Sequence, residues 1–364
     1  MSNKEKISNI QLTFLMMGYV FGSSSIISSS AAAKQDAWLA FLMGLLGGLA
    51  LIGVYIAIYL LNPGKNLIEI LEQVFGQILG SIIGLLYIWY FIHLGALVIR
   101  NFADFMVPSF YSSTPRIILS LVFIITVIFI VKKGIEIVAR ISDLFLPIVL
   151  FGIVATFFLL VTKYDIQNLF PFLEFGIKPV IKASFSVLTF PFGETVIFLM
   201  IFPLVNDKSR LTKSSYTAII IIGLFLFGIT VRDLLVLGPD MFTRTVFPPT
   251  ISTKLIPLGN FDVLIAVNLL IGGVVKISVC LYGAVKGITH VFKIDDYRWF
   301  VLTTGLIMLS LSIWVYDNTP EMLLWASEIY PFYVVPFQII FPSIILISSL
   351  LKNRGNSVKG DENY

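Results

Sequence analysis

The chain has 364 residues, of which 57% are hydrophobic and 13% are charged, and its mean hydropathy is +0.95. Because soluble domains carry roughly 25% charged residues, this composition predicts an integral membrane protein embedded in a lipid bilayer. Cys280 is the only cysteine, and His93 and His290 are the only histidines. An internal disulfide and a histidine metal site are therefore excluded, and no cofactor is expected. No Gly-rich phosphate loop ending in Lys-Ser or Lys-Thr is present, which argues against an ATP-driven pump.

Runs of about 20 apolar residues indicate membrane-spanning helices, and about ten such runs follow one another along the chain. They predict an all-α polytopic membrane protein that forms a single transmembrane domain over residues 1–364. Solid apolar runs, rather than alternating ones, also exclude a barrel of strands. The predicted spans lie near 10–30, 37–61, 80–107, 116–131, 141–161, 181–204, 215–237, 263–285, 299–316 and 332–351.

Lys and Arg are distributed unevenly over the short loops between these spans. If the N-terminus lies inside, the outer loops hold about half as many of these residues as the inner ones, which explains the formal net charge of +4 and suggests no nucleic-acid partner. We therefore expect both termini in the cytoplasm. The cytoplasmic parts would be the N-terminal residues 1–9 and a polar tail, 352–364, expected to be disordered.

Two of the predicted spans are interrupted by small or helix-breaking residues, Gly22-Ser23-Ser24-Ser25 in the first and Pro191-Phe192-Gly193-Glu194 in the sixth. A break in mid-membrane is tolerated only where protein or a water-filled cavity surrounds it. Five spans per half is an odd number, so a second half that repeats the first must be inverted, and helix 1 then corresponds to helix 6. The two breaks would meet near the midplane and hold a charged, amino-acid-like ligand.

Charged residues at membrane depth are costly and therefore indicate function. Glu194 could bind a ligand ammonium group, titrate, or cap free backbone donors. Lys276, in the eighth span, could pair with Glu194 or occupy the place of a coupling cation. Arg100 and Asp104 lie four residues apart, and hence on one helix face, where they could form an outer gate or an ordinary ion pair.

For other positions, the evidence for a function is weaker. Arg232 and Asp233 are adjacent, so each is expected to need a partner elsewhere. His93 could sense pH or simply be hydrogen-bonded within the bundle. The long outer loop 238–261, rich in proline, is expected to form a re-entrant or surface-lying lid, because long loops without regular structure are often functional. The predicted ligand-binding residues are Gly22, Ser23, Ser24, Ser25, Phe190, Phe192, Gly193 and Glu194, and the predicted coupling or gating residues are Lys276, Arg100 and Asp104.

Several motifs, spread along the whole chain, resemble the motifs of one protein family. They are Ala33-Lys34-Gln35-Asp36-Ala37-Trp38 after the interrupted first helix, Gly134 with Ala139-Arg140, Asn168-Leu169-Phe170-Pro171, and Phe190-Pro191-Phe192-Gly193-Glu194. The chain resembles the B-subunit family of bacterial spore germinant receptors, within the amino acid/polyamine/organocation (APC) permease superfamily. One departure is Gly22-Ser23-Ser24-Ser25, where many amino acid permeases have a Gly-x-Gly type of break.

The resemblance implies a LeuT-like fold of five plus five inverted helices with helices 1 and 6 broken. It also implies a location in the spore inner membrane and assembly with an A subunit and a lipoprotein C subunit. The implied function is the sensing of a small germinant such as an amino acid, and our leading hypothesis is that it binds between helices 1, 3, 6 and 8. Two alternatives stay open, a proton-coupled amino acid transporter with Glu194 as the titrating group and a germinant-gated channel component. An enzyme is not expected, because no nucleophile and base are found with a partner that orients them.

Overall fold

The computed structural model describes residues 5–257 and 259–361, and their regular elements are helical apart from one isolated bridge between Ile7 and Val205. Within this part of the chain, 7 helical segments are long and apolar enough to cross a membrane. They comprise η1 (Ala31–Asp36) with α2 (Ala37–Leu61), α4 (Gln77–Phe110), α6 (Ile135–Leu159), α7 (Ile177–Val187) with η4 (Leu188–Phe192) and η5 (Gly193–Met200), η7 (Lys208–Arg210) with α8 (Leu211–Arg244), α10 (Asp262–Val291), and the tenth span.

The tenth span is assembled from five consecutive pieces, which are α12 (Thr319–Leu324), η8 (Trp325–Ile329), α13 (Tyr330–Tyr333), η9 (Pro336–Ile340) and α14 (Phe341–Asp361). Both η8 and η9 are π-helical. Shorter helices of 16, 17 and 17 residues account for the other predicted spans, namely α1 (Asn9–Ser24), α5 (Arg116–Lys132) and α11 (Arg298–Trp314). Each of the predicted spans thus corresponds to a helical segment.

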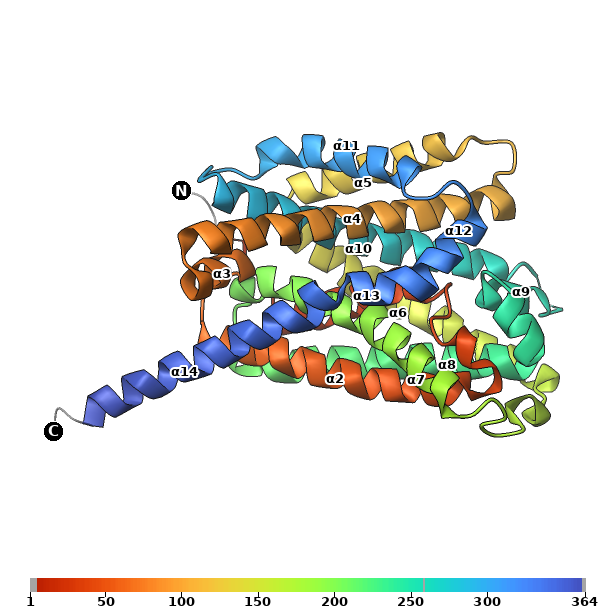
Figure 1. Cartoon of the computed structure of the whole chain (residues 1–364). Coiled ribbons are helices and arrows are strands. Elements are labelled where there is room, and N and C mark those ends of the chain that lie inside the picture. The colour runs from red at the N-terminus through yellow and green to blue at the C-terminus, as the bar shows by residue number, and fades with distance from the viewer. Residues whose placement is uncertain (1–4, 258, 362–364) are drawn as a thin grey trace.

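The helices run along one another as a bundle, in which α5 and α11 lie beside α4 and α10 (Figure 1). At the centre, α1 packs against α10, α8 and α6. Short connecting elements are α3 (Leu67–Phe75), α9 (Pro248–Lys254), η2 (Val161–Lys163), η3 (Ile166–Leu169) and η6 (Phe202–Leu204).

Two glycines let α1 and α10 approach closely at the centre of the bundle. A Cβ on Gly22 would lie 2.8 Å from the carbonyl oxygen of Gly272, which is closer than any side chain allows. Small residues at such crossings are typical of membrane helix pairs, because they let the backbones pack against each other. This contact brings Lys276, one turn after Gly272, next to the end of α1.

Both predicted breaks occur, in different forms. The regular helix of the first span ends at Ser24, and residues 25–30 form turns before η1. In the sixth span the α-helix ends at Val187, passes through the π-helical η4 with Phe190 outside helical geometry, and continues as the 3₁₀ helix η5.

The segment 238–261, which the sequence predicted as a long loop, contains helical structure, while its role as a lid stays a prediction. After a kink at Gly238, α8 continues to Arg244, and α9 begins at Pro248. Proline suits the first position of a helix, where its missing N–H leaves no hydrogen bond unmade. The tail also differs from the expected disorder, because α14 extends to Asp361 and projects beyond the bundle (Figure 1). Of the predicted cytoplasmic ends, residues 1–4 and 362–364 lie outside the described residues, as does residue 258 of the outer segment.

Segments that the charge pattern places on one side of the membrane meet at one end of the bundle. The segment before α1 is linked to α10 and to the start of α11, because the Glu5 carboxylate accepts hydrogen bonds from Tyr282 at 2.6 Å and Tyr297 at 2.7 Å. The neighbouring Lys6 N–H donates at 2.8 Å to Glu136, in the first turn of α6. These contacts fit the alternating inside and outside loops, while which end faces the cytoplasm stays a prediction.

Candidate functional site

A buried ion pair joins the sixth and eighth spans. Lys276 Nζ lies 2.5 Å from Glu194 Oε2, and both side chains are at most 1% exposed. The same ammonium group donates to the Ser23 hydroxyl at 3.1 Å. The pairing between Lys276 and Glu194 that the sequence suggested is therefore present, and it lies where the end of α1 meets the interrupted sixth span.

Aromatic side chains complete the surroundings of this pair. The Tyr330 hydroxyl donates to the second carboxylate oxygen, Glu194 Oε1, and Tyr19 donates to the Glu194 backbone carbonyl at 3.2 Å. The Lys276 ammonium lies 4.9 Å from the centre of the Phe190 ring and 5.4 Å from that of Tyr19, within cation–π range. The charges are thus neutralised and hydrogen-bonded, as buried charges must be.

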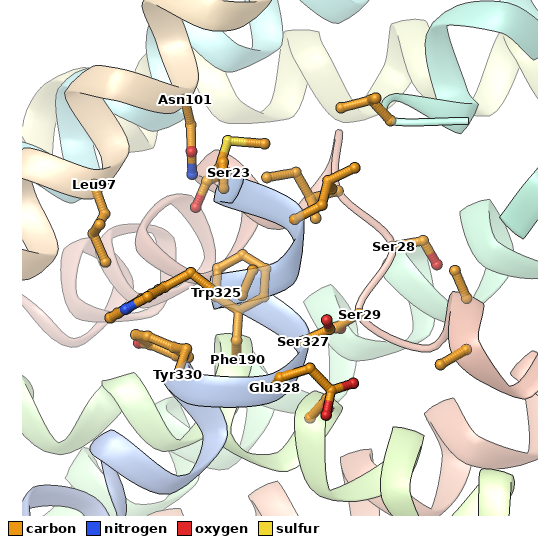
Figure 2. Close-up of a pocket in the computed structure, with 18 of the residues that line it drawn as sticks. Ser23, Ser28, Ser29, Leu97, Asn101, Phe190, Trp325, Ser327, Glu328 and Tyr330 are labelled. Atoms are coloured by element: carbon orange, nitrogen blue, oxygen red, sulfur yellow. The ribbon is translucent and has the colours of Figure 1, made fainter. Parts of the chain in front are cut away.

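A cavity of about 270 Å³ extends from this pair to the protein surface. Four of its lining residues, Ser23, Phe190, Glu194 and Lys276, belong to the predicted sites. Figure 2 shows Ser23, Phe190, Trp325 and Tyr330 around the cavity, with Ser28 and Ser29 further along it. Its walls are otherwise mostly apolar, and they include Ile27, Leu94, Leu97, Val98, Val246, Tyr316, Met322 and Leu323.

The surface end of the cavity is crossed by an exposed ion pair. Lys182 Nζ, on α7, lies 2.6 Å from Glu328 Oε1, on η8, and both side chains are about half exposed. Both residues line the cavity. The sixth and tenth spans are therefore in contact at the mouth of the cavity as well as at its base.

The first predicted break has three further residues, Gly22, Ser24 and Ser25, and none of them lines the main cavity. Gly22 packs on Gly272. The Ser24 hydroxyl donates back to Val20, and the residue lines a separate cavity of about 20 Å³. The Ser25 hydroxyl donates to the Gly22 carbonyl at 3.0 Å and accepts from Asn268 at 2.5 Å. Within this break, only Ser23 reaches the main cavity.

The remaining residues of the sixth-span break support its shape. Phe192 is fully buried, and its ring centre lies 6.0 Å from that of Phe41. The Gly193 carbonyl accepts from the Tyr55 hydroxyl at 3.2 Å. A Cβ on Gly193 would lie 2.1 Å from Gln338 Oε1, so the tenth span packs directly on this glycine.

Arg100 and Asp104 form the pair that their spacing predicted, with Nε 2.9 Å from Oδ2. Arg116 lies 3.1 Å from the other carboxylate oxygen of Asp104. Neither Arg100 nor Asp104 lines the main cavity, whereas Leu97 and Asn101 of the same helix do. The structure therefore places the proposed gate residues beside the cavity and not across it.

For Arg232 and Asp233, the expectation of separate partners is wrong. Arg232 Nη2 lies 2.6 Å from Asp233 Oδ1, and both side chains are 1% exposed. Adjacent residues on a helix do not face each other, but the long arginine side chain bends back to its neighbour and also donates to Thr156 at 2.6 Å. His93 packs among Trp89, Trp325 and Tyr333.

Tyr330, Lys182 and Glu328 were missed by reasoning from the sequence. The predicted tenth span began at 332, because Glu328 and Pro331 interrupt the apolar run. A charge and prolines at the edge of an apolar run are, however, the same signals that mark a broken span. Within the described residues, no three His, Cys, Asp or Glu side chains gather in a group that could hold a metal ion.

Comparison with solved structures defines the class of fold. The chain matches MhsT in complex with L-phenylalanine with a TM-score of 0.67, at 14% identity, covering 96% of both chains. It matches Mhp1, a nucleobase-cation-symport-1 family transporter with bromovinylhydantoin bound, with a TM-score of 0.66 at 12% identity, covering 94% of this chain and 78% of Mhp1. The fold is therefore that of the LeuT-like transporters, with five plus five inverted helices.

Sequence comparison then gives the family. The model of the family described as Spore germination protein matches residues 6–320. The chain is 34% identical to spore germination protein KB of Bacillus subtilis (strain 168), over 99% of each chain. It is 28% identical to the putative spore germination protein YfkT of the same organism, over 87% of each. The chain belongs to this family of spore germination proteins and is a B-subunit homologue.

Proposed function

We propose that this chain is the B subunit of a spore germinant receptor and that its main cavity binds a small zwitterionic nutrient, an amino acid. The observation that carries the proposal is the buried pair of Glu194 and Lys276 at the base of a cavity that reaches the surface. A carboxylate and an ammonium group side by side complement the two charges of an amino acid. The C-terminal end of α1 adds the negative end of a helix dipole, which favours a ligand ammonium.

The dimensions and walls of the cavity support a ligand of this size. A volume of about 270 Å³ lies just below the usual range of small-molecule sites, about 300–1,000 Å³, and suits an amino acid better than a larger compound. Since the walls away from the ion pair are mostly apolar, they favour an apolar side chain on the ligand.

Signalling requires that the ligand binds one conformation better than another. A shift from a rare to a dominant state needs about 5.5 kcal/mol of differential binding. We place the receptor in the spore inner membrane with both termini in the cytoplasm, where an A subunit and a lipoprotein C subunit respond to the shift. Family membership supports this assembly.

A second function, amino acid transport, is favoured by the fold. MhsT, which shares the fold, holds L-phenylalanine. If this chain moves its ligand across the membrane, proteoliposomes containing it will accumulate a labelled amino acid. A receptor without transport activity will bind the same amino acid at equilibrium but show no accumulation.

The binding proposal can be tested on the purified full-length chain in lipid nanodiscs. Binding of L-alanine, L-valine, L-leucine and L-phenylalanine would be measured by calorimetry, together with 3-methylbutylamine and 4-methylpentanoate, which each keep one charged group of leucine. We expect at least one amino acid to bind, with Glu194→Gln raising its Kd about tenfold or more, since a hydrogen bond to a charged group is lost.

The matched control is Glu174→Gln in the outer loop, whose carboxylate accepts from Gln35 and does not line the cavity. This variant should leave the Kd unchanged. Failure of all four amino acids to bind, or equal affinity in Glu194→Gln and the parent chain, would overturn the proposed function. Tighter binding of either leucine analogue than of leucine itself would contradict recognition of a zwitterion.

A further inference from the structure

Both oxygens of the Glu194 carboxylate already accept a hydrogen bond from the protein. Lys276 donates to Oε2 and Tyr330 donates to Oε1. Although Glu194 lines the cavity, its side chain is only 1% exposed. A ligand ammonium that pairs with Glu194, as the proposed function requires, therefore has to displace one of these two donors.

The two donors differ in what their displacement costs. Lys276 is a buried charge that also contacts Ser23 and the Phe190 ring, and a buried ammonium without its carboxylate is strongly destabilising. Tyr330 is neutral and its side chain lines the cavity, so its hydroxyl can turn to the ligand or to water. The tyrosine hydroxyl is the donor that leaves more easily.

Tyr330 also occupies a special place in the tenth span. It is the first residue of α13, a helix of 4 residues with the π-helical η8 before it. The π-helical η9 follows closely. Interruptions of this kind are frequent at functional sites and allow one part of a span to shift against the next.

Among the described residues, three hydrogen-bonded contacts join the tenth span to the sixth. Lys182 pairs with Glu328 at the mouth, Tyr330 donates to Glu194 at the base, and Gln338 Nε2 donates to the Thr189 carbonyl at 3.1 Å beyond it. The Tyr330 contact lies between the other two. It is also the only one of these three contacts that involves the carboxylate which the ligand would use.

We propose that the Tyr330 hydroxyl competes with the ligand ammonium for Glu194, so that ligand binding releases α13 from the sixth span. The tenth span is then the element that responds to occupancy of the cavity. Its continuation, α14, projects beyond the bundle at the end predicted to be cytoplasmic (Figure 1). This inference rests on the proposed function, because it assumes that the ligand pairs with Glu194.

The test is the variant Tyr330→Phe, which keeps the ring and removes the competing hydroxyl. The same four amino acids would be titrated against the full-length chain in nanodiscs. We expect the Kd of the ligand to fall about tenfold, the size expected for one hydrogen bond to a charged group. The matched control is Tyr333→Phe, since Tyr333 lies in the same short helix but packs against His93 and Trp325.

The direction of the change separates competition from a structural role. If Tyr330 only supports the site, its removal leaves the Kd unchanged or raises it, and either result overturns the inference. An equal fall in Tyr333→Phe would indicate a general loosening of the tenth span and would also overturn it. If no amino acid binds the parent chain, or if Glu194→Gln binds normally, the proposed function itself fails.

Discussion

Lys276 depends on Glu194 for its charge balance, because the structure brings no other carboxylate within ion-pair distance of it among the described residues. Its cation–π contacts with Phe190 and Tyr19 contribute about 0.5–2 kcal/mol each. These are smaller than the cost of removing one partner from a buried ion pair, about 3–5 kcal/mol. The ion pair therefore dominates the local energetics of the site.

We expect Lys276→Met to lower the stability of the folded chain by about 3–5 kcal/mol, because Glu194 is left buried without its cation. The double variant Lys276→Met with Glu194→Gln should recover most of this loss, since neither charge remains. The unfolding midpoints of the purified variants in nanodiscs give the comparison.

The control for this prediction is Lys182→Met, which breaks the half-exposed pair with Glu328. Exposed pairs contribute about 0–1 kcal/mol, so this variant should unfold close to the parent chain. If Lys276→Met were no more damaging than Lys182→Met, or if the double variant were worse than the single one, the buried pair would not have the assigned role.

At the level of residues, the sequence was sufficient to find Glu194 and Lys276, because charges are conspicuous within apolar spans. It was not sufficient to choose among the four residues from Gly22 to Ser25, since the direction of each hydroxyl depends on how α1 packs. Tyr330 carries no such signal, because a tyrosine in a membrane protein is usually an interfacial or packing residue.

Among the helices, the α1–α10 contact positions the site. The first helix ends at Ser24, and its last turns lie against Gly272, one helical turn before Lys276. Gly22 is therefore better explained by close approach of two backbones than by contact with a ligand, although the sequence suggested the latter.

This explanation predicts that Gly22→Ala destabilises the chain by about 1–3 kcal/mol, the usual cost of overpacking, because the added Cβ would lie 2.8 Å from the Gly272 carbonyl oxygen. Gly152→Ala on α6 is the control, since its Cβ would meet Leu264 at an ordinary 3.5 Å. Equal unfolding midpoints for the two variants would contradict the close contact.

The spans themselves were predictable, because each needs about 20 apolar residues and the runs are clearly separated. The breaks in helices 1 and 6 were also visible, as glycine and proline within apolar runs. The interruptions of the tenth span and the helix α9 were not, because proline was taken as a residue outside a helix where it instead lies in the first turn of one. Sequence alone does not distinguish these two uses of proline.

Across the whole molecule, the cavity connects the surface near η8 with the centre of the bundle. At the opposite end, the residues before α1 are held by Tyr282, Tyr297 and Glu136. The sixth and tenth spans follow the cavity from its mouth to its base and contact each other at several levels. Occupancy of the cavity can therefore influence both spans, which would give the partner subunits of the proposed receptor a conformational difference to detect.

The central claim is that Glu194 belongs to the nutrient-sensing site, and the most direct measurement is the germination dose response of spores that carry Glu194→Gln. Spores with Glu174→Gln serve as the control, and subunit abundance is checked by immunoblot. With the subunit present at normal abundance, we predict that the half-maximal nutrient concentration rises about tenfold or more, or that the response is lost. An unchanged dose response at normal abundance would contradict the account.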